Sequence, residues 1–145
     1  MQVTRAGEYA IIGLLYLAQQ PASSTVMIEE ISDAEKIPNS FLAKIFQSLA
    51  KGGLVVSHRG VGGGFSLARP ADTINLLHIL QSVEGEFALQ KCVAVVDPEC
   101  VVAESRLGTC VLCGVFAEAQ NRVNEVFTRT TLANLVERSA VVPVT

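Results

Sequence analysis

The sequence predicts a mainly α-helical fold with one small β-hairpin, followed by a long C-terminal helix. Apolar residues recur at helical spacing through most of the first 85 residues, and again from about residue 110. Two short β-prone runs flank a glycine-rich stretch at residues 60–64. Half of the 145 residues are hydrophobic, only 17% are charged, and the mean hydropathy is +0.41, which excludes a wholly disordered chain.

Two helices are expected before residue 36. Residues 4–19 are apolar on most sides, so this helix should be buried on most faces, and Pro21 ends it. A short helix is expected over residues 26–34, with Met27, Ile28 and Ile31 facing inward.

The clearest helical pattern lies over residues 38–51. Pro38 and the small polar residues after it mark the start, and Gly52-Gly53 mark the end, where a residue with positive φ is wanted. Four apolar residues follow the i, i+3, i+4, i+7 spacing of a buried stripe: Leu42, Ile45, Phe46 and Leu49.

The opposite face of this helix carries short or basic side chains and no acidic one. Residues 54–57 and 65–68 are predicted to be the two strands of a hairpin with residues 58–64 at its tip. Helix, turn, helix and hairpin is the order of a winged helix-turn-helix. The outward face of the third helix consists of Ser40, Ala43, Lys44, Gln47 and Lys51.

A fourth helix completes the predicted DNA-binding domain of residues 1–85. Asp72-Thr73 offer its N-cap and Gly85 ends it. Its apolar stripe consists of Leu76, Ile79, Leu80 and Val83.

The remaining chain divides into a cysteine-bearing segment and a helical end. Residues 86–109 show neither helical nor strand periodicity, and we expect a cysteine-bearing loop there. Residues 110–145 are expected to hold a long helix to about residue 129, a shorter one over about 131–137, and a C-terminal tail. A long helix without a following partner of comparable length favours pairing with the same helix of a second subunit, and therefore a homodimer.

The charges are unevenly distributed, although the net charge is −3. Residues 36–71 carry five basic and no acidic residues, between two acidic flanks. Such a stretch can present one positive face to a polyanion, or it can be an ordinary solvated surface. A nucleotide-binding loop at the glycines is excluded because no Gly-Lys-Ser or Gly-Lys-Thr follows and Phe65 stands where a dinucleotide fingerprint needs glycine.

The third helix and the hairpin tip supply the expected contacts to double-stranded DNA. Ser40 and Gln47 are placed to contact bases or phosphates, while Lys44 and Lys51 neutralise phosphates. At the tip, Arg59 suits a narrow minor groove and the glycines from Gly60 onward allow close approach to the backbone. His58, beside Arg59, is expected to contact phosphate, whereas His78 is expected to be a satisfied interior or boundary histidine.

Four cysteines lie within 22 residues: Cys92, Cys100, Cys110 and Cys113. The partial positive charge at a helix N-terminus favours thiolates at the last two. The spacing fits an iron-sulfur cluster, a zinc site or a redox dithiol, and unconnected buried thiols also remain open. A small CxxC thiol oxidoreductase is disfavoured because no thioredoxin-like βαβ pattern surrounds the pair. No Ser/His/Asp set or paired carboxylates stand out, so we expect no enzyme.

The apolar run at residues 10–18 has the outline of a secretory signal because it follows Arg5. We reject that interpretation because Glu8 lies at its edge, and the run is shorter than the roughly 20 residues that cross a bilayer. A cytoplasmic protein without a membrane partner is therefore expected. In that compartment the cysteines are expected to bind metal or undergo redox chemistry.

Taken together, the motifs resemble the Rrf-two family of bacterial transcription regulators over almost the whole chain. The resemblance implies a homodimer whose long C-terminal helices cross and whose two winged heads read a dyad-related operator. The motifs that carry it are Thr4-Arg5-Ala6-Gly7-Glu8-Tyr9-Ala10, Ile37-Pro38-x-Ser40-Phe41-Leu42-x-Lys44-Ile45, Arg59-Gly60-x-Gly62-Gly63-Gly64-Phe65 and Val83-Glu84-Gly85.

The resemblance also implies a sensory cofactor. In cluster-binding members three cysteines of this loop ligate an iron-sulfur cluster, and a fourth ligand differs between members. Cys113 stands in the place of one such ligand and Glu8 in the place of the other, so a two-iron two-sulfur cluster on four cysteines is expected, with Glu8 as the alternative fourth ligand. The cysteine intervals are longer than is typical of the family, and members without a cluster exist, so a zinc-based or direct thiol switch remains open.

Overall fold

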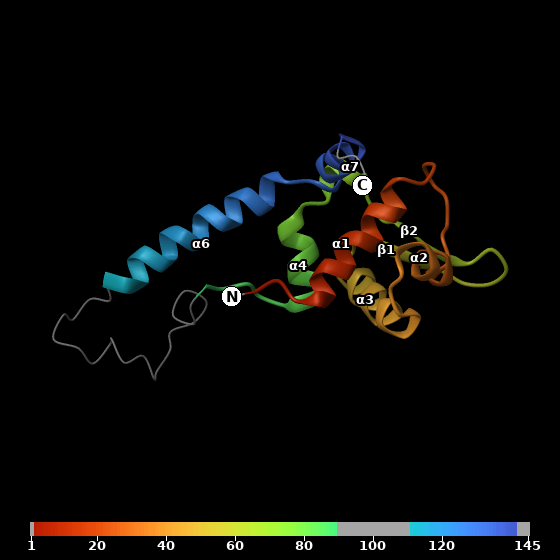
Figure 1. Ribbon diagram of the computed structural model, residues 1–145, viewed down its shortest axis with the longest axis horizontal. Helices are drawn as coiled ribbons and strands as arrows, with labels where there is room; N and C mark the ends of the chain where they lie inside the picture. Colours follow the sequence, from red (N-terminus) through yellow and green to blue (C-terminus); the bar gives the residue numbers. More distant parts are fainter. Residues whose placement is uncertain (1, 90–110, 142–145) are drawn as a thin grey trace.

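The computed structural model describes residues 2–89 and 111–141, which form a compact helical head and one long projecting helix (Figure 1). The predicted order of helix, turn, helix and hairpin, with a long helix after it, is confirmed. The elements are α1 (Arg5–Ala18), α2 (Ile28–Glu35), α3 (Asn39–Lys51), β1 (Val55–His58), β2 (Gly64–Leu67), the 3-10 turn η1 (Ala71–Thr73), α4 (Leu76–Glu84), α6 (Val111–Arg129) and α7 (Leu132–Val141).

Helix α1 runs through the middle of the head and contacts α2, α3, α4, α7 and β2. Leu14 is fully buried, and Gly13 lies against the ring of Phe46. A Cβ added at Gly13 would lie 2.7 Å from the Phe46 Cε2 atom. The glycine therefore lets α3 approach α1 closely. The apolar pattern of residues 4–19 does not by itself predict this close approach.

The predicted stripe of α3 is buried as expected, with Leu42, Phe46 and Leu49 fully inaccessible to solvent. Phe46 also meets Phe65 of β2 edge-on, with 5.1 Å between ring centroids. The helix ends as predicted, because Gly53 adopts a φ of 75°.

The prediction for the second helix is wrong in two details. The helix begins at Ile28 rather than at residue 26, and Met27 is 54% exposed instead of facing inward. Met27 is the N-cap residue with an extended backbone, so its side chain lies outside the helical register. Ile28 and Ile31 are buried as expected.

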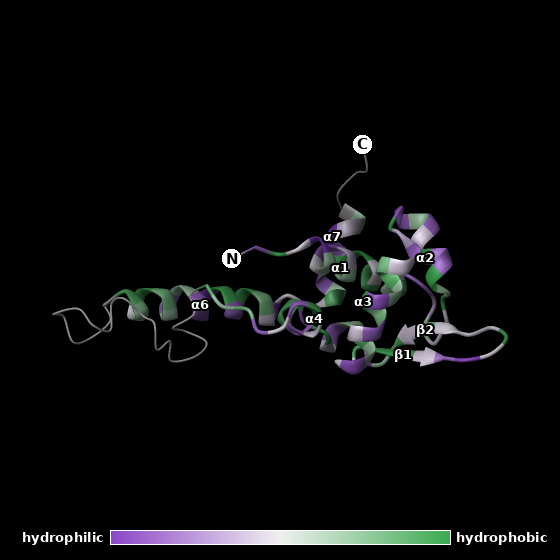
Figure 2. Ribbon diagram, turned by 90° about the horizontal axis from the view of Figure 1, so that it is seen from below, coloured by the Kyte–Doolittle hydropathy of each residue, from purple (hydrophilic) through white to green (hydrophobic). Residues whose placement is uncertain are grey.

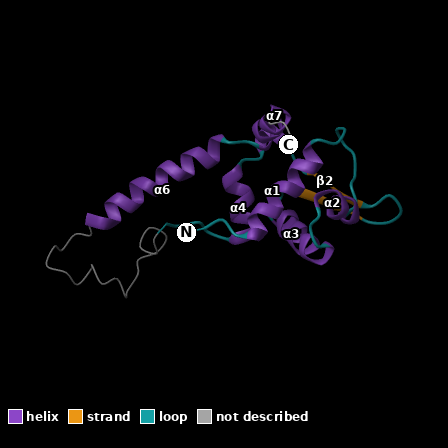
Figure 3. Cartoon of the chain, viewed as in Figure 1, coloured by secondary structure: helices purple, strands orange, loops and turns teal. Residues whose placement is uncertain are grey.

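The hairpin is a two-stranded antiparallel sheet with His58 opposite Gly64 (orange in Figure 3). Phe65 also exchanges two backbone hydrogen bonds with Val26, at 2.8 and 2.9 Å. Gly64, with a φ of 145°, makes this contact possible because a Cβ there would overlap the Val26 carbonyl. The wing is thus fastened to the chain just before α2.

Helix α4 is capped by a residue that the sequence did not single out. The Asn75 side chain accepts a hydrogen bond from the backbone N–H of His78 at 2.8 Å. Asp72 and Thr73, the predicted cap, lie in η1 instead. A 3-10 turn displaces them because the chain must first bury Ile74 before the helix begins.

The last residue of α4 reaches the first turn of α1. Glu84 Oε1 accepts hydrogen bonds from the Thr4 backbone N–H, at 2.7 Å, and from the Thr4 hydroxyl. Gly7 leaves room for this carboxylate, because a Cβ there would collide with it. The carboxylate also suits the positive end of the α1 dipole.

Helix α7 returns the chain to the head. It extends from Leu132 to Val141, further than the predicted 131–137, and Thr131 caps it by accepting a hydrogen bond from Asn134 N–H at 3.1 Å. Leu132 is fully buried and donates its N–H to Ile74. None of the helices within residues 2–89 and 111–141 has the length and apolar character that a membrane crossing requires.

Candidate nucleic-acid interface

Helix α3 presents the four side chains that were predicted to contact DNA. Ser40, Lys44, Gln47 and Lys51 are all exposed. Pro38 supplies no side-chain cap, and the first turn contains no acidic residue. The backbone N–H groups at the start of α3 therefore keep their partial positive charge, which favours an anion such as phosphate.

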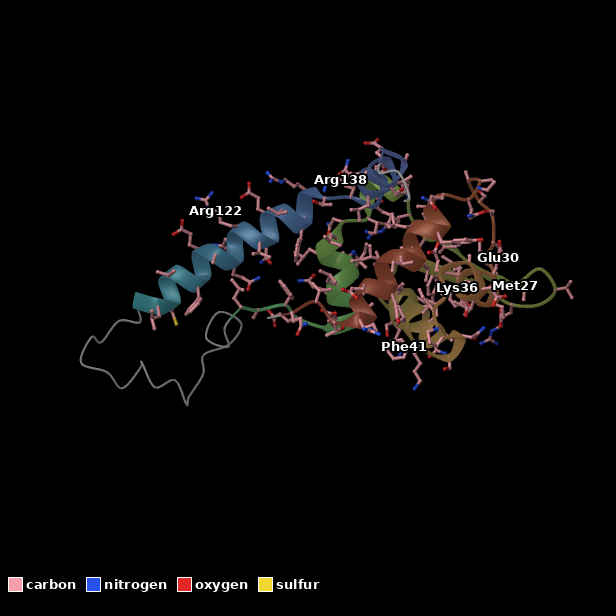
Figure 4. All side chains as sticks on the ribbon, in the orientation of Figure 1. Met27, Glu30, Lys36, Phe41, Arg122 and Arg138 are labelled. Carbon is pink, nitrogen blue, oxygen red and sulfur yellow. The ribbon has the colours of Figure 1, made fainter. Side chains whose placement is uncertain are left out.

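Three further exposed residues lie around the start of α3 and were not among the predicted DNA contacts. Lys36 ends α2 in a left-handed conformation, with a φ of 58°, and is exposed. Asn39 opens α3, and Phe41 remains 43% exposed although its ring meets Tyr9 edge-on. Figure 4 shows Met27, Lys36 and Phe41 in the part of the head formed by α2 and α3. An apolar residue outside the buried stripe was the available signal for Phe41.

The wing carries the second group of predicted DNA contacts. His58 closes β1, with its Nε2 atom 2.8 Å from the Ser66 hydroxyl across the hairpin. Arg59 follows it and is exposed. The chain then turns at Gly60, whose φ is 93° and whose carbonyl accepts a hydrogen bond from the Gly63 N–H at 2.9 Å.

A cavity of about 460 Å³ lies between the wing and the starts of α2 and α3. Asn39 and Ala43 line it from α3, Met27 from the chain before α2, and His58 with the wing glycines from the opposite side. The only acidic residue in this lining is Glu29. Helix α3 and the wing thus border one concave surface of mainly uncharged residues.

The basic residues of this region are largely unpaired. Among residues 2–89 and 111–141 the one ion pair joins Arg122 to Glu118 on α6, at 3.6 Å. The basic side chains of residues 36–71 are exposed except for Arg69, whose Nη2 lies 2.8 Å from the Nδ1 of His78. Because arginine only donates, His78 accepts this bond, so it is a satisfied boundary histidine as expected.

Four of the five acidic residues among residues 1–36 lie on α2, and the fifth, Glu8, lies on α1. Glu29, Glu30, Asp33 and Glu35 are exposed there. The Tyr16 hydroxyl donates a hydrogen bond to Glu30 at 3.0 Å. This bond, with desolvation and the negative charges of Glu30 and Glu35, raises the pKa of Tyr16 above its ordinary value of 10.0. Basic and acidic side chains are therefore separated between the two helices of the motif.

The predicted cysteine site lies mostly outside the described residues. Cys92, Cys100 and Cys110 all fall in the segment 90–110. Cys113 lies in the first turn of α6 and is partly buried, and Glu8 is exposed in the first turn of α1. Within residues 2–89 and 111–141 no three His, Cys, Asp or Glu side chains come together as a metal site would require.

The chain that leads into this segment is held against α6. Leu89 donates its backbone N–H to Gln120 Oε1 at 2.7 Å, and Gln120 is only 4% exposed. Phe87 packs on Phe127, with 5.6 Å between ring centroids. One end of the segment 90–110 is therefore anchored at the middle of α6, and the other end begins α6 itself.

The sequence model of a family described as "Iron-dependent Transcriptional regulator", Rrf2, matches residues 3–138. The chain belongs to the Rrf2 family. It is therefore a DNA-binding transcription regulator of the helix-turn-helix class, and its relatives are regulators rather than enzymes.

Curated relatives agree with this membership. A putative HTH-type transcriptional regulator of Aquifex aeolicus is 33% identical over 128 residues, which cover 88% of this chain and 86% of that protein. The HTH-type transcriptional regulator IscR of Vibrio vulnificus is 29% identical over 145 residues, which cover 99% of this chain and 82% of that protein.

Two solved structures share the fold at lower identity. T. potens IscR has a TM-score of 0.74 at 23% identity, covering 100% of this chain and 94% of that one. CymR, the global cysteine regulator of B. subtilis, has a TM-score of 0.73 at 22% identity, covering 95% and 98%. The similarity of fold confirms the predicted winged-helix architecture.

Proposed function

We propose that this Rrf2-family regulator acts as a homodimer that reads operator DNA through α3 and the wing, and that its cysteine segment holds an iron-sulfur cluster. Cluster state would then set operator affinity in response to redox, iron-sulfur or nitric oxide status. The DNA-binding part of the proposal rests on the surface formed by α3 and the wing. Both elements carry unpaired basic side chains, and they pack together through Phe46 and Phe65.

Each element has a separate task in this proposal. Ser40 and Gln47 contact base edges in the major groove, while Lys44 and Lys51 neutralise phosphates on either side. Arg59 enters the minor groove, where its weakly hydrated guanidinium is attracted by the negative potential. His58 and the backbone at Gly60 contact phosphate.

A salt titration separates these tasks. Duplexes are first selected from a random-sequence library with the full chain, and their affinity is then measured at several salt concentrations. Lys44→Ala should weaken all duplexes and lower the salt slope by about one unit, because one phosphate contact is lost. Arg59→Ala should reduce discrimination between selected and unrelated duplexes.

Arg122→Ala is the matched control, because this arginine projects from α6 and pairs with Glu118. Unchanged DNA affinity in both Lys44→Ala and Arg59→Ala would remove the assignment of α3 and the wing. Equal losses in the Arg122→Ala control would mean that overall charge, rather than this surface, governs binding.

We expect the second copy of the chain to pack against α6. One side of this helix is covered by its own chain, since α6 contacts α4, Gln120 binds Leu89 and Phe127 packs on Phe87. An adjacent stripe leaves Leu112, Val115 and Val126 exposed, at 53%, 62% and 44%. Figure 2 shows apolar residues along most of α6. Spacings of three and eleven residues keep the exposed set on one side, as a helix–helix contact requires.

Chain geometry supports a site shared by the two ends of the cysteine segment. Leu89 is anchored at Gln120, and a helix rises 1.5 Å per residue, so the anchor lies only about 14 Å from the start of α6. Cys92 follows the anchor by three residues, and Cys110 immediately precedes α6. Three extended residues reach about 10 Å, so the covalent connections allow these thiols to meet.

The donor set suits an iron-sulfur cluster. Thiolate is the ligand these clusters take, and Cys113, in the first turn of α6, lies near the partial positive charge of a helix N-terminus, which favours the thiolate. Cys92, Cys100, Cys110 and Cys113 would hold the cluster, with Glu8 as the alternative fourth ligand. A bound cluster supplies one-electron redox chemistry and reactivity toward nitric oxide.

An anaerobic preparation tests the cofactor directly. Visible absorbance together with iron, sulfide and zinc analysis should show about two irons and two sulfides per chain. Cys113→Ser should strongly alter the spectrum, and Glu8→Ala should leave it nearly intact. The reverse pattern would make Glu8 the fourth ligand. Stoichiometric zinc without iron, even after anaerobic reconstitution, would replace the cluster by a zinc-based or thiol switch.

A further inference from the structure

Val61 lies in the turn that joins the two strands of the wing, with 110% relative exposure. It is the second residue of the turn that the Gly63 N–H to Gly60 carbonyl hydrogen bond closes. Gly62, the third residue, has a φ of 78°, which is typical of a type II turn. The side chain of Val61 therefore projects from the apex of the hairpin and packs against no other part of the described chain.

The fold does not account for a valine here. Type II turns favour proline at this position, and a β-branched side chain brings them no advantage. Apart from Val61, every residue between Arg59 and Phe65 is glycine. Two of these glycines, Gly63 and Gly64, would collide with backbone atoms if they carried a Cβ. Val61 is thus the one side chain that the tip offers beyond Arg59.

We propose that the Val61 side chain is a minor-groove probe that selects A·T over G·C base pairs beneath the wing. The inference rests on the proposed DNA-binding function and extends it to a specificity-determining residue. Arg59 senses the width and potential of the groove, whereas Val61 senses what protrudes from its floor.

The chemistry of the groove floor explains the selection. A·T and T·A pairs present only acceptors there, while a G·C pair adds the guanine 2-amino group. An isopropyl group pressed against the floor would cover this amino group without accepting a hydrogen bond from it. A buried donor without a partner is costly, so the guanine pair is disfavoured. At an A·T pair the same side chain meets the adenine C2–H and the sugar walls.

Base analogues isolate the amino group from every other property of the base pair. Hydroxyl-radical footprints of wild type and Arg59→Ala, on a duplex selected with the full chain, locate the base pairs under the wing. These pairs are then replaced by G·C, by inosine·C, which lacks the amino group, or by 2,6-diaminopurine·T, which adds it. Inosine·C should bind like A·T, whereas G·C and 2,6-diaminopurine·T should each bind about tenfold more weakly.

Variants of the tip assign this difference to the side chain. Val61→Ala should flatten the dependence on the amino group because the side chain no longer reaches the floor. Val61→Thr should flatten it too, because its hydroxyl can accept a hydrogen bond from the amino group. Val56→Thr, an exposed valine of β1, is the control and should keep the full difference.

The outcomes separate this inference from the function on which it rests. If the selection yields no duplex, DNA binding itself fails and the inference with it. If wild type binds selected duplexes but Val61→Ala retains the tenfold difference, DNA binding stands and the role of Val61 is wrong. Thermal unfolding of both tip variants should match wild type, since Val61 contributes no buried surface.

Discussion

The head and the arm differ in how they bury their apolar side chains. In the head, formed by residues 2–84 and α7, the α3 stripe is at most 4% exposed. In the arm, formed by α6, Leu112 and Val115 are more than half exposed, and among the described residues α4 and residues 85–89 cover one side of the helix. The head thus carries its own core, whereas α6 leaves apolar side chains exposed in the described part of the chain.

This difference bears on the two roles proposed above, DNA contact by α3 and pairing of subunits through α6. Side chains proposed to contact DNA need fixed positions, and the packed core beneath α3 supplies them. The position of α6, whose apolar stripe is exposed in the described part of the chain, depends instead on the surface that packs against it and on the residue at which the helix begins. Substitutions can therefore disrupt one region and leave the other intact.

The largest effect is expected in the head. Phe46 is fully buried, lies against Gly13 and meets Phe65. Phe46→Ala should lower the free energy of unfolding by about 3–5 kcal/mol, because a large core side chain leaves a cavity. Urea unfolding followed by circular dichroism measures it. Val56→Ala, at a half-exposed position, should change stability by less than about 1 kcal/mol; comparable losses would contradict a core centred on Phe46.

A charge on the arm should dissociate subunits and spare the head. Val115→Glu buries a carboxylate in the proposed dimer contact and should weaken self-association by about 2–3 kcal/mol, or roughly 30- to 150-fold. Sedimentation equilibrium measures the association, and the unfolding midpoint at high dilution should stay unchanged. Asn121→Glu, on the polar side of α6, is the matched control. A Val115→Glu variant that stays dimeric would refute α6 as the contact.

The contact between α1 and α4 inside the head should contribute less to stability. Glu84→Ala removes the acceptor for the Thr4 N–H and hydroxyl, so the head should lose about 1 kcal/mol of stability. Glu84→Gln keeps an acceptor oxygen and should recover part of this loss. Thermal unfolding of the three proteins tests the order, and an alanine variant as stable as wild type would mean that the cap adds nothing.

The smallest effect concerns α2. Because the pKa of Tyr16 is raised, the folded protein holds this phenolic proton more tightly than the unfolded chain does. The associated stabilisation is present below about pH 10 and is lost as the pH rises through the folded pKa. In Glu30→Ala the tyrosinate absorbance of Tyr16 should develop at lower pH than in the wild type. Unchanged titration would exclude Glu30 as the cause.

Much of the fold follows from local sequence patterns. Leu42, Phe46 and Leu49 obey helical spacing, and Gly53 supplies the positive φ that ends the helix, so α3 could be predicted almost to the residue. The hairpin strands were placed within one residue because a glycine-rich tip fixes the turn. Such features depend on neighbours in the sequence.

The remaining features depend on contacts between distant segments. The Thr4–Glu84 cap joins residues 80 positions apart, and the choice of Asn75 over Asp72 depends on where η1 buries Ile74. At the candidate DNA surface, charge alone pointed to Lys44 and Arg59. It could not separate Arg69, which His78 holds against α4, from the basic residues that face outward.

The pair of backbone hydrogen bonds between Val26 and Phe65 fixes the distance between the wing and the helix-turn-helix. Each base pair of B-DNA advances the duplex by about 3.4 Å and turns it by about 35°. A single base pair inserted between the segment contacted by α3 and the segment contacted by the wing would therefore move α3 or the wing out of its groove. With α3 and the wing contacting DNA as proposed, the regulator would measure the distance between two sequence elements as well as their identity.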